Sequence, residues 1–240
     1  HQRFCHRGYH DKPQIPENSL PAFRRAIERG WGAELDVHLL KDGTLAVFHD
    51  SDLFRCTGVS GMIEDLTLPE LKKLRLEGPD EQIPLFDEVL ALFEDATPLI
   101  IELKSANGNH FALSKAVCER LDSYKGTFCI ESFDPFCVLD VKKLRPEICR
   151  GQLSMNFCKD PTRLPCYKCV IAGNMLLNFL TRPDFIAYKF EDRKGLSSAL
   201  CRTLWGIQEV SWTIRQKEDL LEAEQAGSIG IFECFDPDEP

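Results

Sequence analysis

Residues 32–50 read GAELDVHLLKDGTLAVFHD, two short apolar runs joined by a Lys-Asp-Gly turn. The first run alternates acidic with apolar residues, which predicts a strand with one polar and one apolar face. The turn is far too short for a parallel crossover, so the second run, 45–48, is predicted to return as a hairpin. Counting in from the turn, Asp36 lies roughly opposite Phe48 and His49. The hairpin therefore brings carboxylates and a histidine together.

Outside this hairpin, short apolar runs alternate with amphipathic stretches, and this alternation is typical of strand–helix units. The predicted strands, rich in β-branched or aromatic residues, are 3–6, 33–37, 98–103, 127–131, 148–153, 185–190, 207–213 and 229–233. The predicted helices are 19–29, 86–94, 110–121, 135–144, 193–204 and 216–226. Eight strands in a chain of 240 residues predict the α/β class and a TIM-type (β/α)8 barrel.

Residues 51–83 interrupt the strand–helix rhythm. They contain Gly58, Gly61 and the capping-box pattern Thr67-x-x-Glu70, but little that resembles a strand. We interpret them as a small insertion after the early hairpin, lying over the barrel. The whole chain, 1–240, is then predicted to form a single domain.

The charge balance limits the partners that the protein can have. A formal net charge of -9 and a pI near 5.2 argue against nucleic acid or an anionic membrane as a partner. No apolar run approaches the roughly 20 residues that cross a bilayer, so stable membrane insertion is not expected. We expect a small anionic substrate held locally by a few cations, and the oligomeric state stays open.

The 11 cysteines are an odd number scattered through predicted strands, helices and loops. This distribution favours reduced thiols over a disulfide framework, and hence a cytoplasmic protein. A signal peptide is not recognisable before the first predicted strand, although one removed before residue 1 stays open. Cys166-x-x-Cys169, with Cys158 upstream, lacks a second pair at zinc-binding spacing, so no structural metal is expected there.

Three acidic residues are predicted to face the barrel interior. Glu34 and Asp36 are two positions apart on one strand and share a face, and Glu102 closes the next barrel strand, shortly before Lys104. Ordinary solvated carboxylates are the alternative, but barrel-facing acids are costly without a partner. Hard oxygen ligands suit one divalent cation, Mg²⁺ or Ca²⁺, better than zinc.

Two histidines follow strands that lead toward these acids. His6-Arg7-Gly8 comes at the carboxyl end of the first predicted strand, where catalytic groups gather in such barrels, and His49 follows the hairpin. Two histidines beside a cation provide the acid and the base that cleavage of a phosphodiester needs. Which of the two is the acid stays open. The remaining histidines are interpreted as structural: His10, His38 and His110.

Together these residues resemble the glycerophosphodiester phosphodiesterase family in six linked motifs. The motifs are His6-Arg7-Gly8, Glu17-Asn18-Ser19, Glu34-x-Asp36-Val37, Lys41-Asp42-Gly43, His49-Asp50 and Glu102-Leu103-Lys104. The resemblance implies a barrel with a small insertion and assigns roles to seven residues: the metal ligands Glu34, Asp36 and Glu102, the general acid and base His6 and His49, and the phosphate contacts Arg7 and Lys104.

The resemblance continues more thinly beyond these motifs. Trp212 at a strand end is expected to wall the pocket. Glu131 adds an acid close to the site, where it either tunes substrate preference, touches the metal or has a structural role. The chain departs from the family at its last strand, which ends in Glu233-Cys234 where relatives have a Thr-Asp-like pair. A polar wall of the pocket is therefore expected to differ.

The expected activity is metal-dependent hydrolysis of a glycerophosphodiester to glycerol 3-phosphate and an alcohol such as choline or ethanolamine. The attacking oxygen, from water or from the neighbouring glycerol hydroxyl through a cyclic phosphate, stays open. Two alternatives remain. One is a lysophospholipase D-like phosphodiesterase, and the other is a non-catalytic barrel that binds phosphorylated ligands.

Overall fold

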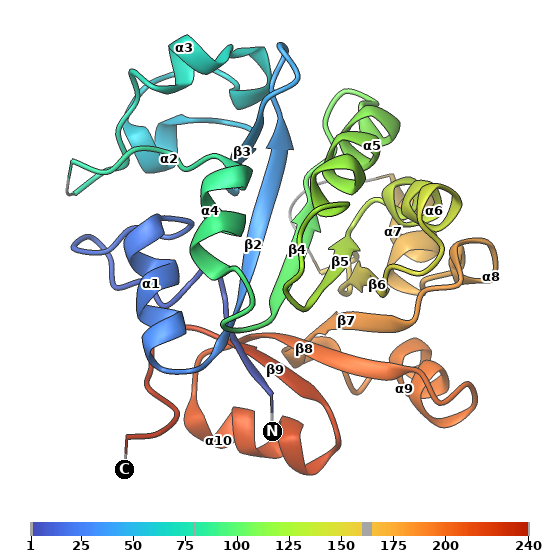
Figure 1. Ribbon diagram of the computed structural model, residues 1–240. Helices are drawn as coiled ribbons and strands as arrows, with labels where there is room; N and C mark the ends of the chain where they lie inside the picture. Colours follow the sequence, from blue (N-terminus) through green and yellow to red (C-terminus); the bar gives the residue numbers. More distant parts are fainter. Residues whose placement is uncertain (1, 79, 160–164, 240) are drawn as a thin grey trace.

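Eight parallel strands close into a barrel in the computed structural model, which describes residues 2–78, 80–159 and 165–239 (Figure 1). The strands are β1 (Arg3–Cys5), β2 (Gly32–Leu39), β4 (Leu99–Leu103), β5 (Phe128–Ser132), β6 (Arg150–Ser154), β7 (Phe185–Lys189), β8 (Gln208–Ile214) and β9 (Ile229–Phe232). β1 pairs in parallel with both β2 and β9, so the first and last strands close the ring. The predicted TIM-type barrel is confirmed, with strand ends within two residues of expectation.

The early hairpin has the predicted register. β3 (Leu45–Val47) pairs antiparallel with β2, and Val37 lies opposite Val47. The Phe48 amide donates to the Asp36 carbonyl oxygen at 3.0 Å, so Asp36 and Phe48 lie opposite each other. The chain therefore leaves the hairpin with His49 directed back toward the acidic strand.

The predicted helices form between the strands and cover the barrel. They are α1 (Leu20–Glu28), α4 (Phe86–Phe93), α5 (His110–Leu121), α6 (Pro135–Leu144), α9 (Leu196–Thr203) and α10 (Lys217–Gln225). Ser19 caps α1 by accepting from the Ala22 amide at 3.3 Å. α9 begins later than expected, because residues 190–192 form a separate 3₁₀ turn and Gly195 is the N-cap.

Two helices between β6 and β7 were not predicted. α7 (Cys166–Gly173) and α8 (Asn178–Thr181) are short, and α7 is rich in cysteine, tyrosine and β-branched residues, which have weak helix propensity. Packing therefore decides their structure. α7 carries the Cys166-x-x-Cys169 pair.

Apolar side chains form one layer inside the barrel and another between the barrel and its helices. Successive β4 residues show the alternation, because Ile100 packs in the inner cluster and Ile101 in the outer one. Glu102, the next residue, again has the inward parity. The inner layer therefore becomes acidic toward the carboxyl ends of the strands.

Within 51–83, the segment predicted as an insertion, the described residues form α2 (Phe54–Thr57), a 3₁₀ turn (Ile63–Asp65) and α3 (Leu68–Leu71). The capping box at Thr67 and Glu70 is present. The insertion has a small apolar core that includes Ile63 and Leu71 and packs on Ala46 and Phe48 of the hairpin. It lies beside the carboxyl end of β2 (Figure 1), so it reaches the same end of the barrel as the acids.

Candidate active site

Three buried carboxylates converge at the carboxyl ends of β2 and β4. Glu34, Asp36 and Glu102 each offer an oxygen within 4.8 Å of the others, and they are 2%, 1% and 7% exposed. Strand register produces this cluster, because Asp36 pairs with Glu102 and Glu102 pairs with Glu131 on β5. Four acidic side chains are thus concentrated on neighbouring barrel strands.

The electrostatics of the cluster are compatible with a cation site. Burial, with the charges of Asp36 and Glu102, raises the pKa of Glu34 well above its usual value. Burial also opposes ionisation of Asp36, but Lys104, His49 and Arg7 outweigh it and lower its pKa. Among the described residues, Asp36 Oδ1 and Glu131 Oε2 are buried without a hydrogen-bond partner. Buried carboxylate oxygens with unused acceptor capacity fit a hard divalent cation such as Mg²⁺ or Ca²⁺.

Two histidines flank the carboxylates, and each is held by an acid. His6 Nδ1 lies 2.6 Å from Glu233 Oε2, and His49 Nδ1 lies 2.5 Å from Asp50 Oδ1. Both histidines line a cavity of about 40 Å³ together with Glu34 and Glu102. The carboxylates bind Nδ1 of each ring, which leaves Nε2 free to exchange a proton with a ligand. Burial lowers the pKa of His6 to about 4, so its imidazole is neutral near pH 7.

Arg7 occupies an unusual turn at the end of β1. Its φ of +54° lies in the left-handed region, and its amide donates to Glu34 Oε2 at 2.8 Å. Gly8 follows at φ +77°, where a Cβ would lie 3.0 Å from atoms of Ala22 and Phe23. The turn therefore fixes the Arg7 guanidinium, which binds Glu17 at 2.8 Å and borders the small cavity.

Lys104 is the second cation of the site. Its Nζ lies 2.9 Å from Glu102 Oε1 and 3.4 Å from Asp36 Oδ1. Burial opposes its charge, but the two carboxylates outweigh burial and raise its pKa. Lys104 lines a second cavity of about 480 Å³ that shares His49, Glu102 and Phe133 with the small one. The two cavities therefore adjoin at the acidic cluster.

Trp212 and Glu131 lie in the wall of the small cavity. Trp212 meets the Phe133 ring edge-on, with centroids 5.4 Å apart. Glu131 is 1% exposed, and burial with the nearby Glu102 charge raises its pKa well above the usual value. All nine residues singled out from sequence thus lie around one site.

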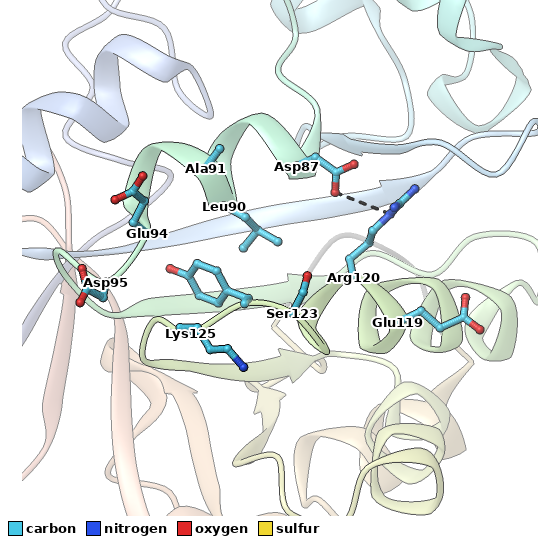
Figure 2. Close-up of a pocket in the computed structure, with 10 residues that line it drawn as sticks. Asp87, Leu90, Ala91, Glu94, Asp95, Glu119, Arg120, Ser123 and Lys125 are labelled. Carbon is cyan, nitrogen blue, oxygen red and sulfur yellow. Dashed lines mark ion pairs between the residues drawn. The ribbon is translucent and has the colours of Figure 1, made fainter.

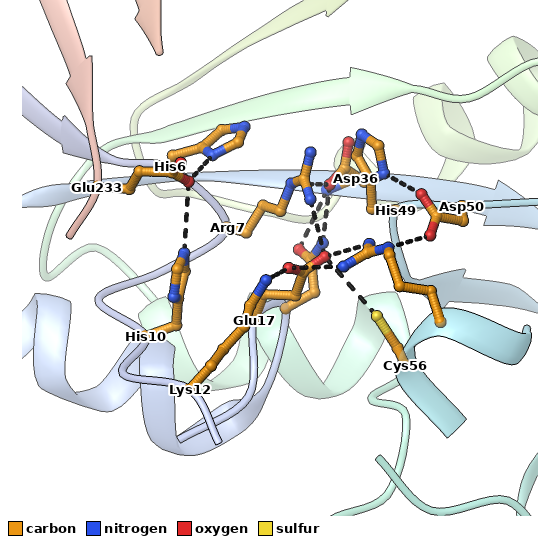
Figure 3. Close-up of polar contacts among 12 residues, drawn as sticks. His6, Arg7, His10, Lys12, Glu17, Asp36, His49, Asp50, Cys56 and Glu233 are labelled. Carbon is orange, nitrogen blue, oxygen red and sulfur yellow. Dashed lines mark hydrogen bonds and ion pairs between the residues drawn. The ribbon is translucent and has the colours of Figure 1, made fainter. Parts of the chain in front are cut away.

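Several residues that hold the site were not predicted to do so (Figure 3). Asn18 Nδ2 donates to Asp36 Oδ2 at 2.8 Å, and Glu17 accepts from Arg7, Lys12 and Arg55. Asn18 and Glu17 both belong to the Glu17-Asn18-Ser19 motif, so the sequence did mark these two residues. The partner of His49 was visible as its neighbour, Asp50. No sequence signal paired Glu233 with His6, because the two residues are 227 positions apart.

The remaining histidines also have acidic partners. His38 lies within the hairpin, binds Glu64 Oε1 at 2.7 Å and contacts the His49 carbonyl at 3.1 Å, so it joins the insertion to the site. His110 Nδ1 binds Asp140 at 2.6 Å between α5 and α6. His10 lies 3.6 Å from Glu233 Oε2.

A hollow of about 660 Å³ lies between α4 and α5, distant from this chemistry (Figure 2). It includes the helix ends that precede β4 and β5, and so it borders the amino ends of the strands. Its ion pair, Asp87 with Arg120 at 3.6 Å, is about 60% exposed on both sides. We assign no catalytic role to this surface.

A parallel barrel with polar groups gathered at the carboxyl ends of its strands defines the class of TIM-barrel enzymes. The sequence profile of the glycerophosphoryl diester phosphodiesterase family matches residues 6–233. The chain belongs to this family, whose members are phosphodiester hydrolases. Among the described residues, no helix is both long and apolar enough to cross a bilayer.

Individual relatives agree with this assignment. The chain is 33% identical to a glycerophosphodiester phosphodiesterase of Caldanaerobacter subterraneus subsp. tengcongensis, over 95% of this chain and 91% of the relative. A phosphodiesterase of Oleispira antarctica, solved in complex with the product sn-glycerol-3-phosphate, is 25% identical with a TM-score of 0.81, covering 97% of this chain and 92% of that one. A lysophospholipase D of Mus musculus is 36% identical over 45% of this chain and 38% of its own length.

Proposed function

We propose that this site hydrolyses glycerophosphodiesters to sn-glycerol 3-phosphate and a free alcohol. The observation that carries the proposal is the pair of histidines, each held by a carboxylate, on either side of a buried three-acid cluster. The product bound by the Oleispira antarctica relative supports the same substrate class.

Glu34, Asp36 and Glu102 would hold one divalent cation, Mg²⁺ or Ca²⁺. When bound, the cation offsets charge that develops on the phosphoryl oxygens. The metal ligands themselves are held in place by neighbours, because Asn18 binds Asp36 and the Arg7 amide binds Glu34. Such supporting contacts orient the carboxylates before the substrate arrives.

His6 and His49 would share the proton transfers. One accepts the proton of the attacking oxygen, and the other donates a proton to the departing alcohol. Arg7 and Lys104 contact the phosphate, where a fork and a point charge complement its oxygens. Both the direct attack of water and a cyclic phosphate route are compatible with this division of roles.

The second cavity is where we place the alcohol group. It is lined by Phe133 and Phe157, and by Ala172 of α7, beside the polar residues Lys104 and Asp134. Trp212 and Glu131 wall the deeper part of the site. The apolar side of this cavity makes a lysophospholipid the second substrate to test, and the Mus musculus relative favours the same comparison.

The buried thiols support a reducing compartment for this reaction. Cys5, Cys118 and Cys201 lie in the protein interior as free cysteines. An oxidising environment would favour disulfides in a chain with this cysteine content. We therefore place the activity in the cytoplasm.

The decisive experiment measures release of glycerol 3-phosphate from glycerophosphocholine and glycerophosphoethanolamine, in Mg²⁺, in Ca²⁺ and in EDTA. We expect metal-dependent release that His6→Ala and Glu34→Ala both abolish. A lysophosphatidylcholine arm tests the alternative substrate. If folded, metal-supplied protein binds glycerol 3-phosphate but turns over none of these substrates, the barrel is a binding protein.

A further inference from the structure

We propose that Glu233, itself held by Arg215, is the positioning residue that fixes the tautomer and orientation of His6. This inference rests on the proposed catalytic role of His6. It goes beyond the family resemblance, because the chain departs from the family pattern at this strand end.

Strand pairing places the two residues side by side. β1 and β9 are neighbours in the barrel, and the His6 amide donates to the Phe232 carbonyl at 2.8 Å. The residue after Phe232 therefore projects beside the His6 ring. Closure of the barrel, rather than local sequence, creates the contact.

The contact uses both oxygens of the carboxylate. Glu233 Oε2 lies 2.6 Å from His6 Nδ1, and Oε1 accepts from Arg215 Nε at 2.8 Å. The side chain of Glu233 is only 12% exposed. Burial opposes its charge, but the histidine contacts and Arg215 outweigh burial and lower its pKa, so the carboxylate is ionised. An ionised carboxylate accepts only, which requires His6 to carry its proton on Nδ1 and to present Nε2 as the exchanging nitrogen.

The other catalytic histidine has the same arrangement. His49 Nδ1 binds Asp50, and the second oxygen of Asp50 accepts from Arg55. In each unit a carboxylate links the imidazole to an arginine, and the two units come from different parts of the chain. Figure 3 shows the two histidine–carboxylate contacts. In both units the arginine pairs with the carboxylate that holds the imidazole, and so adds to the histidine contact in favouring the ionised carboxylate.

A purely structural role would also explain why Glu233 lies beside His6. Its ion pair with Arg215 joins β9 to the segment after β8. The His110–Asp140 pair supplies a matched control for this possibility. It has the same Nδ1-to-carboxylate distance of 2.6 Å, yet His110 lines neither cavity of the site. A purely structural carboxylate should behave like Asp140.

The test combines ¹⁵N NMR of the histidine rings with steady-state kinetics. We compare the wild type with Glu233→Gln, Glu233→Asp and Asp140→Asn. We expect wild-type His6 to be protonated at Nδ1, and Glu233→Gln to give a mixture of tautomers. We expect kcat for glycerophosphocholine to fall about 10–100-fold with little change in KM, as for other residues that orient catalytic groups. Glu233→Asp should restore part of the loss, and Asp140→Asn should leave kcat unchanged.

Two results would overturn the proposal. One is a His6 tautomer that Glu233→Gln does not change. The other is a kcat loss for Glu233→Gln that Asp140→Asn reproduces. The NMR measurement needs no turnover, so it decides the role of Glu233 even if glycerophosphodiesters are not substrates. Failure of the proposed function is thereby distinguished from failure of this inference.

Discussion

At the scale of single residues, the acidic cluster combines charges that repel one another in the absence of a cation. Burial and its two acidic neighbours raise the pKa of Glu34 well above its usual value. Its ionisation is therefore unfavourable in the folded, metal-free protein. A cation changes this balance by making all three charges favourable.

Replacing Glu34 by glutamine tests this balance. We expect Glu34→Gln to be at least as stable as the wild type without metal, because it removes a repelled charge. Metal at about 100 times its Kd should stabilise the wild type by about 2.7 kcal/mol and the variant far less. Thermal unfolding with and without Mg²⁺ measures both. A variant that is still stabilised like the wild type would remove Glu34 from the metal site.

Glu17 makes a pH-dependent contribution to stability. It is 3% exposed and accepts from Arg7 and Arg55; burial raises its pKa, but these contacts outweigh burial and lower it below the usual value of 4.5. A lowered folded-state pKa stabilises the protein above about pH 4.5, and this contribution is lost as the pH falls below that value.

We therefore expect the difference in unfolding free energy between the wild type and Glu17→Gln to be largest above pH 4.5. The difference should shrink steadily at lower pH, because Glu17 becomes protonated on unfolding. Urea denaturation at a series of pH values measures it. A difference that is independent of pH would mean that Glu17 acts through its shape and not through its charge.

Sequence reasoning found the residues that alternation and motifs mark. Glu34 and Asp36 share a face by strand periodicity, and the hairpin turn indicated that His49 returns to them. The partner of His6 could not be found in this way. Glu233 reaches His6 only through β1–β9 pairing, and no local pattern encodes which strands become neighbours across the closure.

At the scale of elements, the insertion is a small unit with its own core on the hairpin. Leu71 is fully buried there, and the cluster extends to Phe48, next to His49. His38 links the same insertion to the His49 carbonyl through Glu64. Packing of the insertion therefore supports the segment that carries His49, one of the two proposed catalytic histidines.

Truncating Leu71 should weaken this unit. We expect Leu71→Ala to lower the unfolding free energy by about 2–5 kcal/mol, since it leaves a cavity in a small core. Lys73→Ala, an exposed change on the neighbouring turn, should stay within about 0.5 kcal/mol of the wild type. Urea denaturation followed by circular dichroism compares the two. Equal stability of both variants would mean that the insertion core contributes little.

Element prediction succeeded where periodicity was strong and failed where packing decides. α1 and α5 have clear apolar faces or capping signals, and their ranges agree with expectation within a residue or so. α7 and α8 are short, and residues of weak helix propensity outnumber the strong helix formers in both, so propensity gave no signal. The failure to predict α7 matters for function, because Ala172 of α7 lines the cavity that also contains Lys104.

At the scale of the whole molecule, we predict that the barrel and its insertion unfold together as one domain. The insertion core shares Ala46 and Phe48 with the hairpin that extends β2, so the insertion does not bury its apolar surface alone. Amide hydrogen exchange in increasing urea tests this prediction. Amides of 63–71 and of β4 should lose protection over the same range. Earlier loss in the insertion would define a separate unit.

The pairing of the first strand with the last has a consequence for biosynthesis. The ribosome makes Glu233 227 residues after His6, which at about 5–20 residues per second takes roughly 10–50 s. During that interval β1 has no β9 to pair with, and His6 has no carboxylate to set its ring. A nascent chain therefore carries most of the site's residues long before it can use them, and activity begins only after Glu233 has been made.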